Sequence, residues 1–432
     1  MSFAYFRDVL PSGLRVVTVE APHLHTAVVA AYVRVGSRHE TPKTNGVSHF
    51  LEHLFFRGSE DYPDTVQMNA AVEEVGGNLN GVTTRDHGYY YTPLHPDHLE
   101  VGLRILGDML TRPRLVDLEV ERQVILEEML DEVDERGRDI DLDNVSKMLL
   151  FKGNPLSLKI AGTKESVGGI KQAQVEEHFA RFYRASNMVV AAAGKVSRAQ
   201  VLELAERTFR GLPLGGEPPL EEPPPHGLRK GPLFHHILHS EAQTELRMSF
   251  PTVPEQHPDF VSLQLLRRVL DDGLSSRLPF QVVERRGLAY SVHASLETYH
   301  DVGLFEVDVA SAPEKLTQVG EEILRVLGEL CETGPSEEEL RRAKRRNRIF
   351  LDFAQDSPAE LASWFGATEL FRIPESFSSR AEAADAKSVG ELVRVAREYL
   401  CLKNLVVTAV GPKRGISALK TALEKSTALP PG

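Results

Sequence analysis

The chain has 432 residues, of which 41% are hydrophobic and 26% are charged, a composition typical of soluble globular proteins. Its formal net charge of −12 disfavours nucleic acid as a general partner, and no apolar run approaches the roughly 18 residues that a membrane helix needs. Its two cysteines, Cys331 and Cys401, exclude a disulfide framework and a multi-cysteine zinc site. Any metal would therefore need nitrogen and oxygen ligands.

The N-terminal sequence MSFAYFRDVLPSGLRVV contains neither the basic region nor the apolar stretch of a secretory signal peptide. With Met1 as the true start, we expect a cytoplasmic protein without membrane segments. An upstream start codon would change this expectation.

Hydrophobic periodicity predicts a mixture of strands and helices. Strands rich in β-branched residues are expected at 13–20, 26–37 and 304–311. Helical spacing is found at 98–112, 115–135 and 317–332. Because strands and helices do not alternate strictly, the pattern favours an α+β fold, with a mainly antiparallel sheet and helices packed on one face.

Prolines and glycines crowd together near the middle of the chain, which predicts a linker at 213–232 between domains at 1–212 and 233–432. The two halves also resemble each other. FYRASNMVVAAAG and EYLCLKNLVVTAVG each contain a tyrosine, an asparagine and an apolar strand that ends in glycine, at Gly194 and Gly411. We therefore predict two related units in tandem.

The segment GVSHFLEHLFF, which starts at Gly46, has helical spacing, and Ser48 is a plausible N-cap. On this helix His49 and His53 lie one turn apart, with Glu52 beside them. Two imidazoles so placed can occupy adjacent corners of a zinc tetrahedron, and the glutamate can accept a proton from water at the metal. The order His-x-x-Glu-His is a known zinc peptidase signature, although a merely polar helix face would also produce it.

A catalytic zinc site usually has a third protein ligand. The predicted helix EVERQVILEEMLDEVDE at 119–135 offers several carboxylates. Glu121 and Glu128 are seven residues apart and share a face, but helical period alone does not choose between Glu127 and Glu128. A solvated acidic helix is the alternative interpretation.

Three motifs in order resemble the pitrilysin family of zinc peptidases, which includes insulin-degrading enzyme and mitochondrial processing peptidase. They are HFLEHLFFRGS, then EEVGGNLNGVTTRDHGYYYTPLHPDHLE at 73–100, then ERQVILEEMLDE at 121–132. The resemblance extends over nearly the whole chain, including the two related halves and ERRGLAYSV at 284–292.

The resemblance implies one Zn²⁺ per chain, bound by His49, His53 and Glu128 rather than by the neighbouring glutamate. It implies that Glu52 is the general base in peptide-bond hydrolysis without a covalent intermediate. Glu121 would act from outside the ligand set, by orienting a ligand histidine or tuning the charge of the site.

In the family, the segment GGNLNGVTT forms an edge strand beside the zinc to which an extended peptide adds as a further strand. Asn80 and Gly81 match its central positions, and Tyr290 matches a substrate-contacting tyrosine. The arginine that the family has seven residues before that tyrosine is replaced here by Val283. We therefore expect a dimer, either with a related chain that supplies the arginine or with a second copy that uses Tyr290 alone.

Together these features predict a zinc metalloendopeptidase that hydrolyses internal bonds of unfolded peptides. One alternative is a non-catalytic structural or partner subunit of a peptidase-like complex. A zinc-dependent hydrolase that acts on other substrates is a further alternative, disfavoured because an edge strand suits an extended backbone.

Overall fold

The computed structural model describes residues 3–214, 232–373 and 376–432, so most of the predicted linker lies outside the described residues. The chain divides into two compact units, each built from discontinuous segments. The first contains Met1–Leu130, Leu158–Glu222 and Asp352–Glu375, and the second contains Asp131–Ser157, Pro223–Leu351 and Ser376–Gly432. The units therefore do not follow the predicted ranges 1–212 and 233–432, because each half of the chain contributes one segment to the other unit.

The first unit is built on a six-stranded sheet in the order β1-β2-β6-β3-β5-β4. Neighbouring strands are antiparallel except β2 and β6, which are parallel. The strands are β1 (Ala4–Val9), β2 (Arg15–Glu20), β3 (Ala27–Val33), β4 (Asn80–Thr83), β5 (Gly88–Leu94) and β6 (Met188–Gly194). Every residue of β3 and β6 is buried, as expected for central strands covered on both faces.

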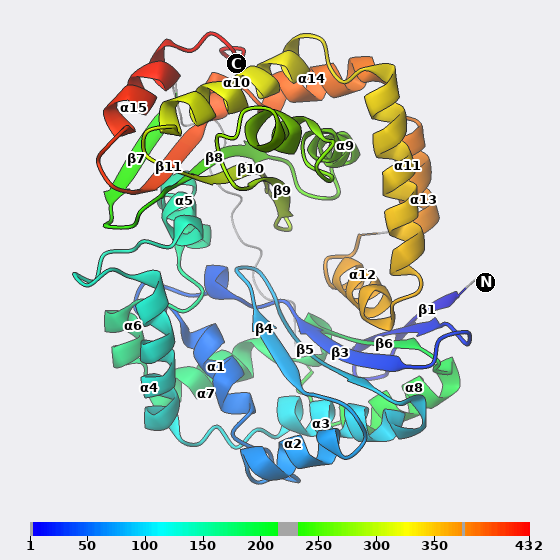
Figure 1. The fold of residues 1–432 in the computed structure, drawn as a ribbon. Helices are drawn as coiled ribbons and strands as arrows, with labels where there is room; N and C mark the ends of the chain where they lie inside the picture. Colours follow the sequence, from blue (N-terminus) through cyan, green and yellow to red (C-terminus); the bar gives the residue numbers. More distant parts are fainter. Residues whose placement is uncertain (1–2, 215–231, 374–375) are drawn as a thin grey trace. The chain divides into compact units, whose positions relative to one another are not determined.

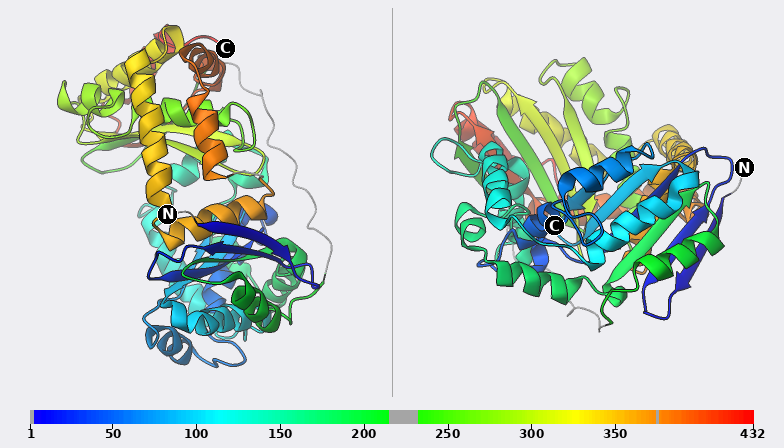
Figure 2. Two further views of the ribbon diagram at one scale, coloured as in Figure 1. Left: turned by 90° about the vertical axis from the view of Figure 1, so that its right-hand side faces the viewer. Right: turned by 90° about the horizontal axis from the view of Figure 1, so that it is seen from below.

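Helices cover both faces of this sheet. Its α-helices are α1 (Val47–Phe55), α2 (Thr65–Glu73), α3 (Leu99–Thr111), α4 (Leu118–Glu128), α6 (Lys164–Gly169), α7 (Gln172–Phe182), α8 (Arg198–Thr208) and α12 (Pro358–Leu370). α12 lies across one face, against β2, β3 and β6, while α3 and α8 lie on the opposite face (Figures 1 and 2). Gly366 permits the close approach of α12, because a Cβ atom there would lie 2.3 Å from the ring of Tyr32.

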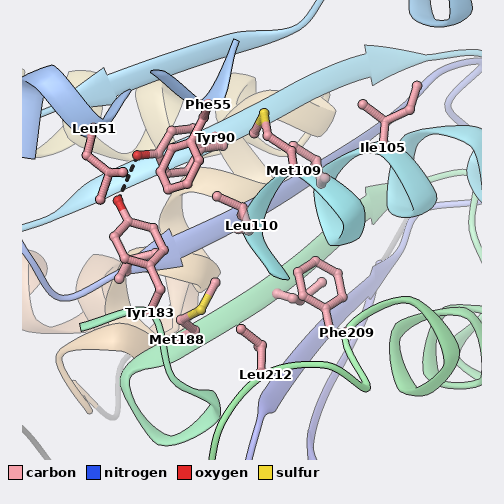
Figure 3. Packing of buried hydrophobic residues seen from close by; sticks show 14 of the residues in the cluster. Leu51, Phe55, Tyr90, Ile105, Met109, Leu110, Tyr183, Met188, Phe209 and Leu212 are labelled. Carbon is pink, nitrogen blue, oxygen red and sulfur yellow. Dashed lines mark hydrogen bonds between the residues drawn. The ribbon is translucent and has the colours of Figure 1, made fainter. Parts of the chain in front are cut away.

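The core of the first unit fixes the orientation of α1 (Figure 3). Phe50, Leu51, Leu54 and Phe55 are fully buried, and each such side chain contributes about 1.5–3 kcal/mol through burial. Nearby, the hydroxyl groups of the buried Tyr90 and Tyr183 share a hydrogen bond of 2.8 Å. This packing leaves the opposite face of α1, with its histidines, directed away from the core.

The second unit is built on a five-stranded sheet in the order β7-β11-β8-β10-β9. Its strands are β7 (Leu233–Leu238), β8 (Thr244–Thr252), β9 (Val292–Thr298), β10 (Gly303–Ser311) and β11 (Val406–Gly411). The α-helices of the second unit are α5 (Leu142–Leu150), α9 (Phe260–Leu270), α10 (Leu316–Glu332), α11 (Glu337–Ala354), α13 (Phe377–Asp385), α14 (Val389–Tyr399) and α15 (Ile416–Lys425), and only the last turn of α11 belongs to the first unit. α5 packs on β8 and β11, on the face opposite α10 and α14 (Figure 1).

The two sheets have related topologies. In each, a buried strand (β6 or β11) is parallel to one neighbour and antiparallel to the other, and it is followed by a helix. Both strands end in a glycine with positive φ, Gly194 at 112° and Gly411 at 152°. The α+β class with two domains is therefore confirmed, with one additional helix on the second face of each sheet.

The predicted strands coincide with β2, β3 and β10, and two of the predicted helices coincide with α3 and α10. The helix predicted at 115–135 is wrong in its bounds. α4 ends at Glu128 and continues as a 3₁₀ turn from Met129 to Glu132. The acidic run that follows Glu128 accounts for the difference, because carboxylates near a helix C-terminus are repelled by the helix dipole.

Candidate metal centre

The N-terminus of α1 is held by a glutamate from earlier in the chain. The helix is capped by Gly46, which has a φ of 93°, so the predicted N-cap at Ser48 is wrong. The buried carboxylate of Glu40 accepts hydrogen bonds from the backbone N–H groups of Gly46 at 2.7 Å and Ser48 at 2.8 Å. It also accepts one from Nδ2 of Asn45 at 2.9 Å. Glu40 thus satisfies donors that a helix N-terminus leaves free.

His49, His53 and Glu128 come together at the exposed side of α1. Nε2 of His53 lies 3.3 Å from Nε2 of His49 and 3.5 Å from Oε2 of Glu128, and the latter oxygen lies 3.8 Å from Nε2 of His49. In a tetrahedral zinc site with bonds of about 2.0–2.1 Å, neighbouring ligand atoms lie about 3.3 Å apart. The three side chains therefore fit a zinc ion without rearrangement of the backbone.

The protonation state of His49 suits a metal ligand. Burial, assisted by the neighbouring His53, lowers the pKa of His49 to about 3. The imidazole is consequently neutral at physiological pH, with a lone pair available on a ring nitrogen.

A second layer of contacts orients His53. Its Nδ1 lies 2.9 Å from Oε2 of Glu121, whose side chain is only 7% exposed. Nδ1–H therefore donates to the carboxylate, and Nε2 remains free to face Glu128. The other oxygen of Glu121 accepts a hydrogen bond from Nε of Arg57. The family resemblance implies an outer role for Glu121 beside a ligand histidine, whereas Arg57 was not among the expected site residues.

Glu52 lies between α1 and the edge of the sheet. The hydroxyl group of Thr83 donates a hydrogen bond to Oε2 of Glu52. Burial raises the pKa of Glu52, although the Thr83 hydrogen bond and His53 act in the opposite direction. A carboxylate in this setting has the raised pKa that suits a general base.

β4 forms one edge of the first sheet and contains Asn80 and Gly81. Within the described residues β4 is paired only with β5, with Asn80 opposite Tyr91. A Cβ atom on Gly81 would lie 3.1 Å from Cγ of Glu52 and 3.0 Å from the ring of Phe56. The glutamate of the motif therefore packs against β4 at Gly81, and β4 is an edge strand of the sheet.

Tyr290 and Val283 belong to the second unit. Tyr290 is 92% exposed. Val283 lies in a π-helical turn (Pro279–Glu284) and packs against the core of its own unit. Nearby, Arg286 pairs with Glu322 at 3.1 Å and Arg285 contacts Gln281 at 3.3 Å.

A second group of carboxylates also gathers within the described residues, at Asp143, Glu297 and Glu306. Nζ of Lys147 lies among them, 2.9, 2.7 and 3.0 Å from the three side chains in that order. Because the ammonium group of Lys147 already pairs with these carboxylates, the cluster of His49, His53 and Glu128 is the better candidate for a metal site.

Sequence reasoning missed Glu40, Arg57 and Thr83. Arg57 follows His53 by four residues, so helical spacing could have indicated it. Thr83 is two residues after Gly81, and strand alternation places both on one face. Glu40 carries no local signal, because its contacts depend on the path of the loop before α1.

Comparisons with known proteins show the family to which the chain belongs. The family model described as Insulinase (Peptidase family M16) matches residues 15–164, and the model described as Peptidase M16 inactive domain matches residues 169–347. An uncharacterised zinc protease of Mycobacterium tuberculosis is 32% identical over 400 residues, which cover 91% of this chain and 90% of that protein. The chain belongs to the M16 peptidase family.

Other M16 proteins extend this result. The mitochondrial-processing peptidase subunit beta of Blastocladiella emersonii is 32% identical, with 93% of this chain and 88% of that protein covered. The crystal structure of a protease from Helicobacter pylori superposes with a TM-score of 0.88 at 21% identity, covering 95% of this chain and all of that one. The resemblance to the pitrilysin family is confirmed, and relatives named zinc proteases support zinc as the cofactor. Over the parts of the chain that the structure describes, no helix is both long and apolar enough to cross a membrane.

Proposed function

We propose that this M16 protein is a zinc-dependent endopeptidase that hydrolyses internal bonds of unfolded peptides. The observation that carries the proposal is the arrangement of three candidate ligands around one point. Glu52 lies on the same helix as the two histidines and packs against β4, an edge strand of the first sheet. Ligands, base and docking edge are the three parts that peptide hydrolysis at a metal requires.

His49, His53 and Glu128 would hold the zinc ion. When bound, zinc supplies Lewis acidity and promotes ionisation of water at neutral pH. Glu52 accepts a proton from the attacking water and returns it to the leaving amine as the peptide bond breaks. Thr83 holds the Glu52 carboxylate by its hydroxyl group, and Glu121 holds the ring of His53.

Peptide binding follows from the free edge of β4. An extended peptide can pair its backbone N–H and C=O groups with those of Asn80 and its neighbours, and Gly81, which has no side chain, lets Glu52 pack close against this strand. A folded substrate cannot dock in this way, because its own secondary structure already occupies those backbone groups. This requirement favours unfolded peptides over folded proteins and over small esters.

We further propose that the chain acts as a dimer. Val283 packs against a hydrophobic core at the position where the family resemblance predicts an arginine, so the chain does not supply that charge there. A related partner chain would provide it, and a homodimer that relies on Tyr290 is the other arrangement. The presence of Val283 instead of arginine also favours the second candidate function, a partner subunit without catalytic activity.

Cleavage of quenched fluorescent peptides tests the proposed chemistry. Zinc-loaded protein should cleave unstructured peptides internally, lose this activity with a chelator and regain it when zinc is restored. Small esters and amides serve as comparison substrates and should be turned over far more slowly. Equal turnover of peptides and small esters would contradict the assignment as a peptidase.

A further inference from the structure

The carboxylate of Glu121 joins two partners at opposite ends. One oxygen accepts the Nδ1–H of His53 at 2.9 Å, and the other accepts the Nε–H of Arg57. Arg57 follows α1 directly, whereas Glu121 lies in the first turn of α4. The three side chains therefore form a continuous chain of contacts that ends at a candidate metal ligand.

Arg57 holds the oxygen of Glu121 that His53 does not use. The Glu121 side chain is almost fully buried, so both of its carboxylate oxygens need hydrogen-bond donors. Nδ1–H of His53 satisfies one oxygen, and the guanidinium group of Arg57 satisfies the other and fixes the position of the carboxylate.

His53 in turn depends on Glu121. A carboxylate oxygen that accepts a hydrogen bond at Nδ1 fixes the proton on that nitrogen and leaves the lone pair on Nε2, the atom that faces His49 and Glu128. His49 has no equivalent support, since its Nδ1 is buried without a hydrogen-bond partner within the described residues. Orientation of the ligand pair therefore depends mainly on the contacts of His53.

We propose that Arg57 is a positioning residue of the metal centre. It holds the Glu121 carboxylate in place, and through Glu121 it presents Nε2 of His53 to zinc. This inference rests on the proposed zinc site, and it adds a residue to that site that neither touches the metal nor contacts the substrate.

A purely structural role for Arg57 makes a different prediction. If its ion pair only joins the end of α1 to α4, its removal lowers stability and leaves the zinc affinity of the folded protein unchanged. Arg112 provides a matched control, because it pairs with the buried carboxylate of Asp108 in the same unit and makes no contact with the metal cluster.

The test is the zinc dissociation constant of the full chain, measured by competition with a chromophoric chelator for R57Q, R57K and R112Q. We expect R57Q to bind zinc about 10-fold more weakly, at the low end of the range for changes in outer contacts of metal ligands. R57K, which retains the positive charge, should recover most of the affinity, and R112Q should match the wild type. An R57Q affinity within twofold of the wild type would overturn the inference.

A double variant keeps the test decisive if R57Q folds poorly. In R57Q/E121Q no buried carboxylate is left without a countercharge, so folding is preserved. If Arg57 acts through Glu121, E121Q and the double variant should have the same zinc affinity. A further loss in the double variant, as large as that of R57Q alone, would overturn the inference. Absence of zinc binding by the wild type would instead contradict the proposed function itself.

Discussion

At the scale of single residues, the site depends on two carboxylates that are held by different contacts. Glu121 is fixed by Arg57 and His53, whereas Glu52 receives a hydrogen bond from Thr83. The contacts of Glu121 act on a candidate metal ligand, and the contact of Thr83 acts on the candidate base. Substitutions around the two glutamates should therefore affect zinc affinity and turnover separately.

Replacing Thr83 with valine should lower peptide turnover roughly 10-fold to 100-fold, because a hydrogen bond to a charged group contributes about 1.5–3 kcal/mol. Zinc affinity should stay unchanged, since Thr83 contacts Glu52 and no candidate ligand. Thr83→Ser, which retains the hydroxyl group, should restore turnover. Steady-state kinetics of the three proteins with one fluorescent peptide measures this, and equal kcat for Thr83→Val and wild type would contradict it.

Glu40 leads to a prediction about pH. Burial raises its pKa from 4.5 to about 7, even though hydrogen bonds from Asn45, Gly46 and Ser48 favour the ionised form. Between these values the folded state retains a proton that the unfolded state has lost. The contribution of Glu40 to the free energy of unfolding is therefore full below pH 4.5 and falls by up to about 3 kcal/mol as the pH rises to 7.

The Glu40→Gln variant removes this titration. Urea unfolding of both proteins at pH 5 and pH 7.5 should show that the stability of the wild type, relative to the variant, is lower at the higher pH. A difference between the two proteins that does not change with pH would exclude a raised pKa at Glu40.

At the scale of elements, α5 is attached to the second sheet by a buried ion cluster. Lys147 has a fully buried side chain among Asp143, Glu297 and Glu306, and Arg247 reaches Asp143 at 2.7 Å. The segment that contains α5 follows α4, which ends with a candidate metal ligand.

Lys147→Met should lower the free energy of unfolding by about 3 kcal/mol, the low end for removal of one partner of a buried ion pair, because the buried Glu306 then keeps only Arg247 as a countercharge. The exposed Lys152, close by in the sequence, offers a control, and Lys152→Met should change stability by less than about 0.5 kcal/mol. Circular dichroism during urea unfolding measures both. Equal stability of the two variants would show that the cluster does not stabilise α5.

Much of the candidate site could be predicted from local sequence, but the chain segments that make up each unit could not. His49, Glu52 and His53 follow from helical spacing, and the motif resemblance chose Glu128 over Glu127. The Glu40 cap and the Lys147 cluster depend on contacts between residues far apart in the chain, which periodicity does not encode. For the same reason, the assignment of α5 and α12 to the sheets of opposite halves did not follow from the linker alone.

At the scale of the whole molecule, the candidate site residues are divided between two units and, by our proposal, between two chains. The candidate metal ligands and the proposed docking edge belong to the first unit, and Tyr290 belongs to the second. Val283 occupies the position of the missing arginine. The chain should therefore need a second chain to complete its substrate contacts.

Light scattering should show two chains per particle, either for this protein alone or after addition of a related M16 chain with an arginine at the equivalent position. Peptide turnover should rise at least about 10-fold when the heterodimer forms, if the partner supplies the arginine. Full activity of a strictly monomeric chain would contradict this prediction.

The most direct test of the central claim is to measure zinc content and peptide turnover together in the wild type and in Glu52→Gln. The account predicts about one zinc per chain in both proteins and a loss of turnover in the variant of at least about 100-fold, as for removal of a general base. Glu127→Gln, which changes a neighbouring exposed glutamate, should retain both properties. Unchanged turnover in Glu52→Gln, or a wild type that binds no zinc, would contradict the account.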